Sequence, residues 1–336
     1  MTGDLRLGLT LGYWAAEKWD PTDLVLEAER LGYETAWTAE AYGSDAFTPL
    51  AWVGARTSRI KLGTGIVQIS ARTPAAVAMT AATLDHLTDG RFILGLGVSG
   101  PQVVEGWYGQ PFPKPLARTR EYVEVIRRIL RREGPVSFDG EHYPLPYPGG
   151  TGLGKPLKLT VHPLRADLPI YLGAEGPKNV AQAVEIGDGW LPIFWSPYRS
   201  EMYGDALSNL PEGFQIAAPV SVVVADDVAA GLMLVKWYLA FYIGGMGAAS
   251  MNFHLNVIGR MGFEEEAAHV QKLFMDGDRE AAAKAVPDAL ADEISLVGPP
   301  GRIKERLQAW IDSPVTQLLA GTRDPEALKV LADALS

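Results

Sequence analysis

The sequence predicts an α/β fold, a (β/α)8 TIM barrel, and assigns residues 1–336 to a single domain. Eight apolar segments with strand character alternate with segments of helical periodicity. The length of 336 residues is that of one large α/β barrel, and a hydrophobic content of 47% is enough for a closed core. The length alone also permits two domains, but the alternation of strands and helices favours one barrel over an open doubly wound sheet.

The strand and helix signals follow one another along the chain. Strands are predicted at residues 6–13, 35–40, 60–67, 91–98, 169–175, 190–194, 216–225 and 315–320. Proline at the first helical position marks helix starts at Asp20-Pro21, Thr73-Pro74 and Gly176-Pro177, and Gly32 and Gly187 end two helices. With few exceptions a helix follows each strand, as parallel strands require.

Two stretches are predicted to be insertions at the catalytic rim, after strands four and seven. Residues 106–163 contain an amphipathic helix near 120–132 and then a stretch rich in proline and glycine without periodicity. Residues 244–298 begin with a glycine-rich run and contain two further helical segments. Strand four itself carries Gly95 and Gly97, which suit either a ligand close to the backbone or tight packing in the barrel.

The composition argues against several classes of function. The absence of cysteine excludes disulfides and thiolate metal sites and fits a reducing compartment. A net charge of −10 argues against nucleic acid or an anionic membrane surface as a partner. No leader pattern is visible and no apolar run is expected to reach the roughly 18 residues of a membrane span. A cytoplasmic protein that acts on a small molecule is the expectation.

The predicted rim contains few conventional catalysts. The active site of a (β/α)8 barrel lies at the C-terminal ends of its strands, and the only carboxylates expected there are Glu40 and Glu175. The histidines are scattered without ligand spacing, so no metal site is expected: His86, His142, His162, His254 and His269. The rim instead offers aromatic and small residues, which suit a large planar cofactor that supplies its own chemistry.

The strongest local signal is the strand-to-helix transition at residues 172–179. Gly176-Pro177 begins a helix whose free amides and positive dipole end can bind a phosphate, and Lys178 can add a charge. The same residues would also be a good helix start without any ligand. Because the whole chain is negative, an anionic cofactor would depend on local features of this kind.

Several motifs stand in an order that resembles the luciferase-like monooxygenase superfamily. They are Ser70-Ala71-Arg72-Thr73-Pro74, the run at residues 84–92, Gly95-Leu96-Gly97-Val98-Ser99, Ala174-Glu175-Gly176-Pro177 and Gly187-Asp188-Gly189-Trp190. The chain looks most like the branch that uses the deazaflavin coenzyme F420, which includes methylenetetrahydromethanopterin reductase and a glucose-6-phosphate dehydrogenase. The resemblance implies coenzyme F420 as cofactor and a homodimer or higher homo-oligomer.

The resemblance also implies individual site residues. It places a non-prolyl cis peptide bond at Gly65-Ile66, behind the central ring of the deazaflavin. The implied cofactor contacts are Glu40, Gly65, Ile66, Val67, Gln68, Gly97, Val98, Ser99, Glu175, Gly176, Pro177, Lys178 and Asn179. Aromatic residues predicted to contact substrate are Trp14, Tyr42, Trp107 and Trp195, although packing between loops would explain them equally well.

One departure from the family pattern bears on the reaction. Members of the F420 branch commonly carry Asp-His at the end of strand two, where this chain has Glu40-Ala41. Glu40 is therefore the expected catalytic residue, without a histidine base beside it; a surface carboxylate is the alternative. We expect hydride transfer between the deazaflavin and a small organic substrate, and reduction of an activated C=C or C=N bond rather than sugar oxidation. The alternatives are an FMN-dependent luciferase-like monooxygenase and a non-catalytic cofactor-binding protein.

Overall fold

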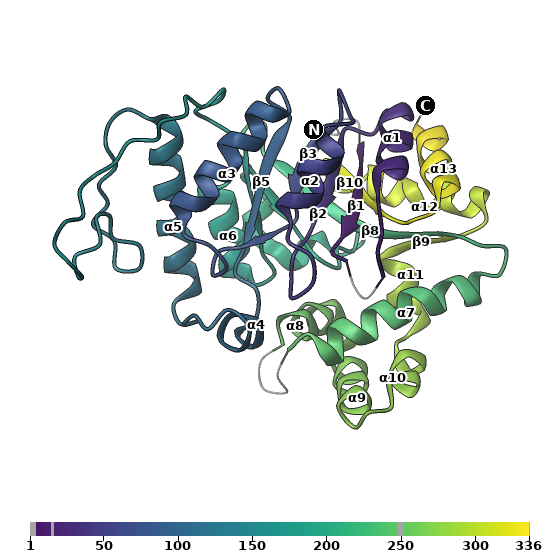
Figure 1. Ribbon diagram of the computed structural model, residues 1–336. Helices are drawn as coiled ribbons and strands as arrows, with labels where there is room; N and C mark the ends of the chain where they lie inside the picture. Colours follow the sequence, from purple (N-terminus) through teal and green to yellow (C-terminus); the bar gives the residue numbers. More distant parts are fainter. Residues whose placement is uncertain (1–4, 15–16, 248–251, 336) are drawn as a thin grey trace.

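In the computed structural model, which describes residues 5–14, 17–247 and 252–335, eight parallel strands close into a barrel (Figure 1). The barrel strands are β1 (Arg6–Gly12), β2 (Thr35–Thr38), β3 (Lys61–Thr64), β5 (Phe92–Gly97), β6 (Ile170–Gly173), β7 (Gly189–Leu191), β8 (Gln215–Val224) and β10 (Gln317–Gly321). They pair in this order, and β10 pairs with both β8 and β1, which closes the cylinder. The predicted fold class is confirmed.

Helices cover the outside of the barrel. They are α1 (Thr22–Arg30), α2 (Phe47–Gly54), α3 (Pro74–Leu87), α5 (Pro115–Arg131), α6 (Pro177–Ile186), α12 (Pro300–Ile311) and α13 (Pro325–Leu335), with the 3-10 helix η1 (Ser200–Leu207) after β7. In α5 the apolar stripe that includes Tyr122, Ile126 and Ile129 is buried, while Arg120 and Arg131 are exposed. Burial of such a stripe is what holds each helix on the sheet.

The barrel interior is filled by large side chains. Trp37, Tyr171 and Leu319 lie there together with Ile93, Leu191 and Ala217, and the ring centroids of Trp37 and Tyr171 are 5.5 Å apart. The interior is therefore a packed core and no channel. The carboxyl ends of the strands open into the cavity described below.

The third strand is interrupted where the resemblance predicts it. β3 ends at Thr64, the Gly65–Ile66 peptide bond is cis, and β4 (Val67–Gln68) continues the strand direction and pairs with β5. The amide of Gly65 donates to the carbonyl of Thr38 at 2.6 Å, which fixes the interruption against the end of β2. The interruption lifts Ile66 out of the strand at the mouth of the barrel.

The stretch 106–163 is not an insertion at the rim. Only α4 (Pro101–Gly106) and residues 107–114 lie there, because α5 is the return helix of the barrel. A chain that leaves by α5 must reach the amino end of β6, so residues 132–169 lie at the opposite end. Arg165 confirms this position, since it contacts Asp85 and the carbonyl of Phe92 at the beginning of β5.

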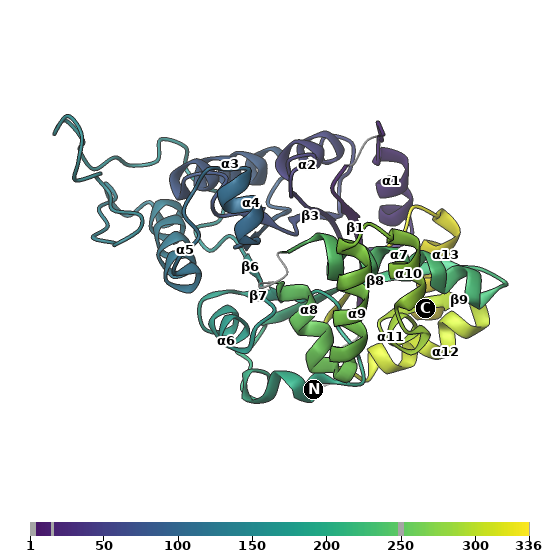
Figure 2. The same ribbon diagram turned by 90° about the horizontal axis from the view of Figure 1, so that it is seen from below.

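The stretch 244–298 belongs to a larger helical unit that already begins with α7 (Val228–Gly245). The unit also contains α8 (Phe253–Ile258), the π-helix η2 (Gly259–Phe263), α9 (Glu264–Met275), α10 (Arg279–Ala285), α11 (Asp288–Glu293) and the unpredicted strand β9 (Ser295–Gly298), which pairs with β8. It has its own core, which includes Leu239, Val257, Val270 and Leu290. Figures 1 and 2 show this unit at the end of the barrel where α4 lies, with α8 and α9 in front of the strands in the second view.

Helix α7 contradicts the expectation that no apolar run reaches the length of a membrane span. With 18 residues, the helix is long enough and apolar enough to cross a membrane, judged by length and composition alone. In the structure 44% of that window is buried, and side chains such as Leu239 and Ile243 pack in the core of the helical unit. Other apolar residues of α7, among them Leu234 and Phe241, line the cavity described below. Packing on two sides thus explains the composition of this helix.

Candidate active site

A cavity of about 1540 Å³ lies between the carboxyl ends of the barrel strands and helices α7 and α8. Most of the residues predicted for the site line it: Glu40, Tyr42, Gly65, Ile66, Gln68, Gly97, Val98, Ser99, Trp107, Glu175, Gly176, Pro177, Lys178 and Asn179. Segments far apart in the sequence therefore meet at the carboxyl ends of the strands, as the predicted barrel fold requires. The volume exceeds that of an ordinary small-molecule pocket and has room for a cofactor and a substrate together.

Ile66 forms a ridge at the mouth of the barrel, and two glycines make room for it. A Cβ atom added to Gly97 would lie 2.8 Å from the Cγ1 and Cδ1 atoms of Ile66, and one added to Gly173 would lie 3.1 Å from its Cγ2 atom. Gly95 serves a different contact, because its Cβ would lie 1.7 Å from the carbonyl oxygen of Thr64. The glycines of strand β5 thus serve the packing of the interrupted third strand, and they leave Ile66 facing the cavity.

Glu40 is held from several sides. Its Oε1 atom accepts from the amide of Gln68 at 2.9 Å, its Oε2 atom accepts from the amide of Ala46 at 3.2 Å, and Nη1 of Arg72 donates to both oxygens at 2.8 and 3.0 Å. The side chain of Glu40 is only 3% exposed. Burial alone would lower the pKa of Arg72, but pairing with Glu40 outweighs it and raises this pKa. The carboxylate therefore joins the loop after β2 to the stretch from β4 to α3, and its lone pairs are largely used within the protein.

Gln68 presents one unsatisfied polar atom beside Glu40. Its Nε2 donates to the carbonyls of Glu40 and Ala41 at 3.1 and 3.3 Å, which fixes the orientation of the amide. Its Oε1 atom is buried and has no hydrogen-bond partner among the described residues. A buried acceptor without a partner is costly, so this oxygen is suited to a donor on a bound molecule.

The start of α6 has the features of an anion site. Gly176 is the N-cap residue, and a Cβ added to it would meet no atom within 4 Å. The amides of Asn179 and Val180 donate to the carbonyl of Gly176. Pro177 has no N–H group. The amide of Lys178 has no helical carbonyl before it to which it could donate, so it is free in the part of the chain that the structure describes. Within the described residues Lys178 forms no ion pair and is exposed. Open space, a free amide and a free charge are thus combined here.

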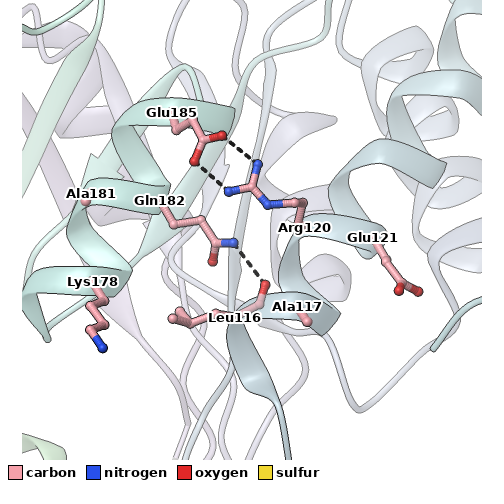
Figure 3. A pocket seen from close by; sticks show the side chains of 8 residues that line it. All are labelled: Leu116, Ala117, Arg120, Glu121, Lys178, Ala181, Gln182 and Glu185. Atoms are coloured by element: carbon pink, nitrogen blue, oxygen red, sulfur yellow. Dashed lines mark hydrogen bonds and ion pairs between the residues drawn. The ribbon is translucent and has the colours of Figure 1, made fainter. Parts of the chain in front are cut away.

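A smaller cavity of about 490 Å³ continues outward from this point, between α5 and α6 (Figure 3). Leu116 and Lys178 line both cavities. Arg120 and Glu185 pair across the smaller one, at 2.7 and 2.5 Å, and Nε2 of Gln182 donates to the carbonyl of Leu116. The charge of Arg120 is thereby neutralised, which leaves that of Lys178 free.

The wall formed by the helical unit contains residues that the sequence analysis did not select: Tyr238, Tyr242 and His254 line the cavity there. Tyr13, which follows β1, also lines the cavity. Nδ1 of His254 lies 3.2 Å from Oε1 of Glu175. Burial, and then the neighbouring Tyr238 and Tyr13, raise the pKa of Tyr242 well above its ordinary value. No local pattern could have predicted this group, because the folding of α7 and α8 over the barrel brings it together.

Three predicted site residues lie elsewhere. Trp195 is fully buried: its ring stacks on that of Tyr203, with centroids 5.2 Å apart, and packs edge-on against Trp190. It does not line the cavity, so its prediction as a substrate contact is corrected. Val67 is buried in the core between the barrel strands and the surrounding helices. The amide of Trp14 donates to Oγ of Ser44, and Trp14 does not line the cavity. Successive side chains of a strand point to opposite faces, so a prediction that is wrong by one residue places a side chain on the wrong face.

Two of the lining residues have unusual backbone conformations. Ser99 has a φ of 60° and Phe194 a φ of 54°, in the left-handed region that non-glycine residues rarely occupy. Both follow barrel strands and line the cavity. Strained backbone of this kind is concentrated at functional sites.

An aromatic cavity over the carboxyl ends of a (β/α)8 barrel defines a barrel enzyme built to bind a cofactor. The family model of the luciferase-like monooxygenases matches residues 18–317. The chain belongs to this family. A Mycobacterium tuberculosis protein provisionally named a coenzyme F420-dependent oxidoreductase is 51% identical, with 99% of each chain covered.

Two further relatives extend the comparison. The 5,10-methylenetetrahydromethanopterin reductase of Archaeoglobus fulgidus is 30% identical and covers 88% of this chain and 87% of its own. The solved coenzyme F420-dependent tetrahydromethanopterin reductase of Methanopyrus kandleri has a TM-score of 0.76 at 24% identity, and covers 99% of this chain and 98% of its own. This structural likeness supports the barrel fold.

Proposed function

We propose that this chain is a coenzyme F420-dependent oxidoreductase that reduces an activated C=C or C=N bond of an apolar small molecule. The observation that carries the proposal is the cavity at the barrel mouth, which combines the Ile66 ridge, the unpartnered oxygen of Gln68 and the free amide end of α6. The relative named for coenzyme F420, at 51% identity, supports the same cofactor. When bound, the reduced deazaflavin supplies the hydride.

The residues present fit this cofactor. A deazaflavin ring carries an imide N–H, for which Oε1 of Gln68 is a buried acceptor without another partner in the described chain. Its phosphate fits the start of α6, where Gly176 leaves open space and Lys178 a free charge. Ile66 would pack against the face of the flat ring that is turned toward the barrel. These residues bind and orient the cofactor, while Glu40 and Arg72 keep Gln68 in place.

The remainder of the cavity favours an apolar substrate. Its outer wall is formed by apolar and aromatic side chains: Trp19, Tyr42, Trp107, Leu234, Tyr238, Phe241, Met246 and Phe253. Among the charged residues that line it, Glu40 pairs with Arg72, and the Arg323 guanidinium lies 4.4 Å from the ring centre of Trp19 without an ion pair in the described chain. The surface offered to a substrate is thus mostly apolar and aromatic.

The alternatives raised by the sequence receive less support. Structures bound to FMN resemble this chain only at the level of the fold; the oxygenating constituent of 3,6-diketocamphane monooxygenase, solved in complex with FMN, is 17% identical. A non-catalytic binding protein would have no need for a histidine and a carboxylate in contact on the cavity wall, as His254 and Glu175 are.

The test is a pair of titrations followed by a turnover assay. Protein fluorescence is followed as coenzyme F420 or FMN is added to the apoprotein under identical conditions. We expect tight binding of coenzyme F420 and weak binding of FMN. The enzyme is then loaded with reduced coenzyme F420 and assayed with a panel of cyclic enones and cyclic imines. Secondary alcohols are assayed in the same way with the oxidised cofactor. Reduction of enones or imines supports the proposal, whereas preferential FMN binding or turnover of alcohols alone contradicts it.

A further inference from the structure

The pair formed by Glu175 and His254 joins the barrel rim to the helical unit. Glu175 follows β6, and His254 is the second residue of α8. Nδ1 of His254 and Oε1 of Glu175 are 3.2 Å apart, but their geometry is not that of a hydrogen bond. In the described chain, Nδ1 of His254 and Oε2 of Glu175 are both buried without a hydrogen-bond partner. Both side chains line the cavity. Two buried polar atoms without a hydrogen-bond partner are unexpected in a merely structural contact.

The imidazole of His254 is held in position by packing. Its ring lies edge-on to Phe194, with centroids 5.8 Å apart, and edge-on to Tyr242 at 5.0 Å. Asn252 fixes the beginning of α8, because its Oδ1 accepts from the amide of Leu255 and its Nδ2 donates to the carbonyls of Ile243 and Tyr242 at 2.6 and 3.3 Å. The end of α7 and the start of α8 are thereby joined, and the ring is aimed at the barrel mouth.

Glu175 is fixed from the other side. Arg260 of η2 donates to its backbone carbonyl at 2.6 Å, which fastens the helical unit to the end of β6. With Nδ1 of His254 beside the carboxylate of Glu175, Nε2 is the ring nitrogen left for a molecule in the cavity. An imidazole oriented by a carboxylate is the usual arrangement of a general acid or base.

We infer that His254 is the catalytic acid that supplies the proton in the reduction, and that Glu175 is its positioning residue. This inference rests on the proposed function. The hydride adds to one carbon of the double bond, the electron pair of that bond moves toward the activating carbonyl or nitrogen, and the developing anion takes a proton from Nε2 of His254. The substrate is reduced by two electrons, the deazaflavin is oxidised, and solvent returns a proton to the imidazole.

The other titratable groups of the cavity are less suited to this step. The lone pairs of Glu40 are used by Arg72 and two backbone amides. Burial raises the pKa of Tyr242 well above its ordinary value, which makes its hydroxyl a weaker proton donor. Burial also raises the pKa of Tyr13. The groups that face His254 are then Glu175, Tyr242 and, one step further, Tyr238, Tyr13 and Arg260.

The experiment uses a stereochemical readout. The wild type and His254→Gln, each loaded with reduced coenzyme F420, are given 2-methylcyclohex-2-enone in D2O, and the configuration of the new centre next to the carbonyl is determined with the rate. We expect one configuration from the wild type. In H254Q we expect a rate about 100-fold lower and a mixture of configurations, because solvent then delivers the deuteron from either face.

Two variants and one binding measurement complete the design. Glu175→Gln is expected to slow the reaction less than H254Q and to displace its pH profile, as a positioning residue should. His269→Gln, on the exposed face of α9, is the matched control and should behave as the wild type. Unchanged affinity of H254Q for coenzyme F420 excludes a folding defect.

The outcomes separate the two proposals. If the wild type and all variants bind coenzyme F420 but reduce neither this enone nor a cyclic imine, the proposed function fails and the proton role of His254 fails with it. If H254Q reduces the enone at the wild-type rate or keeps the wild-type configuration, the role of His254 alone is overturned. A mixed configuration from the wild type also overturns it.

Discussion

Arg72 donates from Nη1 to both carboxylate oxygens of Glu40, at 2.8 and 3.0 Å, and so joins the start of the loop before α3 to the end of β2. The amide of Gln68 donates to the same carboxylate. Glu40 therefore organises the rim around the predicted cofactor ring. We therefore propose a positioning role for Glu40, in place of the catalytic role predicted from the sequence.

Replacing Glu40 by glutamine should lower stability and cofactor affinity together. The amide cannot accept from Arg72 and two backbone amides at once, so we expect a loss of about 2 kcal/mol in the free energy of unfolding. Denaturant unfolding of the apoprotein measures it. Glu34→Gln is the control: Glu34 pairs with Arg6 on the surface, with both side chains about one third exposed, and its loss should cost under about 0.5 kcal/mol. A variant E40Q of wild-type stability with an altered pH profile of reduction would instead make Glu40 a proton carrier.

Replacing Gly176 by aspartate should have opposite effects on folding and on binding. Aspartate is a better N-cap than glycine, and the position has open space, so the apoprotein should gain about 0.5 kcal/mol. The added carboxylate would face the cofactor phosphate, and the dissociation constant of coenzyme F420 should rise at least about tenfold.

The matched control for G176D is Gly301→Asp, in the first turn of α12, where an added Cβ also meets no atom within 4 Å. It should stabilise the protein without any effect on cofactor binding. Calorimetric melting and fluorescence titration of both variants give the two quantities. Equal cofactor affinity in G176D and G301D would remove the start of α6 from the phosphate site.

The pH dependence of folding should reflect Glu29. Burial would raise the pKa of its carboxyl, but backbone amides of Ile60, Arg59 and Ser58 donate to it and lower this pKa overall. A lowered pKa means that the folded state binds the proton less well than the unfolded chain does. The stabilisation is therefore complete above the ordinary glutamate pKa of about 4.3 and is lost as the pH falls through the folded value.

Glu29→Gln should accordingly destabilise the protein at pH 7 by about 1 to 2 kcal/mol and should weaken the dependence of stability on pH below about 4.5. Urea unfolding at a series of pH values measures both. Glu305→Gln, on the exposed face of α12, should leave the curve unchanged. A parallel displacement of the whole curve in E29Q, with the same slope at low pH, would show that this carboxyl does not contribute to acid unfolding.

The sequence was sufficient for the barrel and for the residues at the ends of its strands. Alternating strands and helices fix the topology, and the topology brings Gln68, Ser99 and Gly176 to one cavity. The reason for the glycines could not be predicted from the sequence. Gly97 and Gly173 leave space for the side chain of Ile66, and this contact between different strands exists only in the folded protein. Strand β9 was missed because it has only four residues and follows directly on a helix.

The acid of the proposed reaction could not be found from local sequence. His254 has no partner at ligand spacing, and its contact with Glu175 exists only because α7 and α8 fold back over the barrel. Aromatic residues posed a similar problem. Whether a tryptophan after a strand faces the cavity or the core depends on one residue of register, which hydrophobicity does not reveal.

Trp107 and Trp195 allow this last distinction to be tested. Trp195→Ala removes a fully buried ring stacked on Tyr203, so the free energy of unfolding should fall by about 3 to 5 kcal/mol. Trp107 is 66% exposed and lines the cavity, so Trp107→Ala should change stability by less than about 0.5 kcal/mol but raise the KM for bulky enones severalfold. Trp52→Ala, 50% exposed and remote from the cavity lining, controls for loss of a surface indole. If W107A left KM unchanged while a folded W195A changed it, the original assignment of Trp195 to the substrate would be restored.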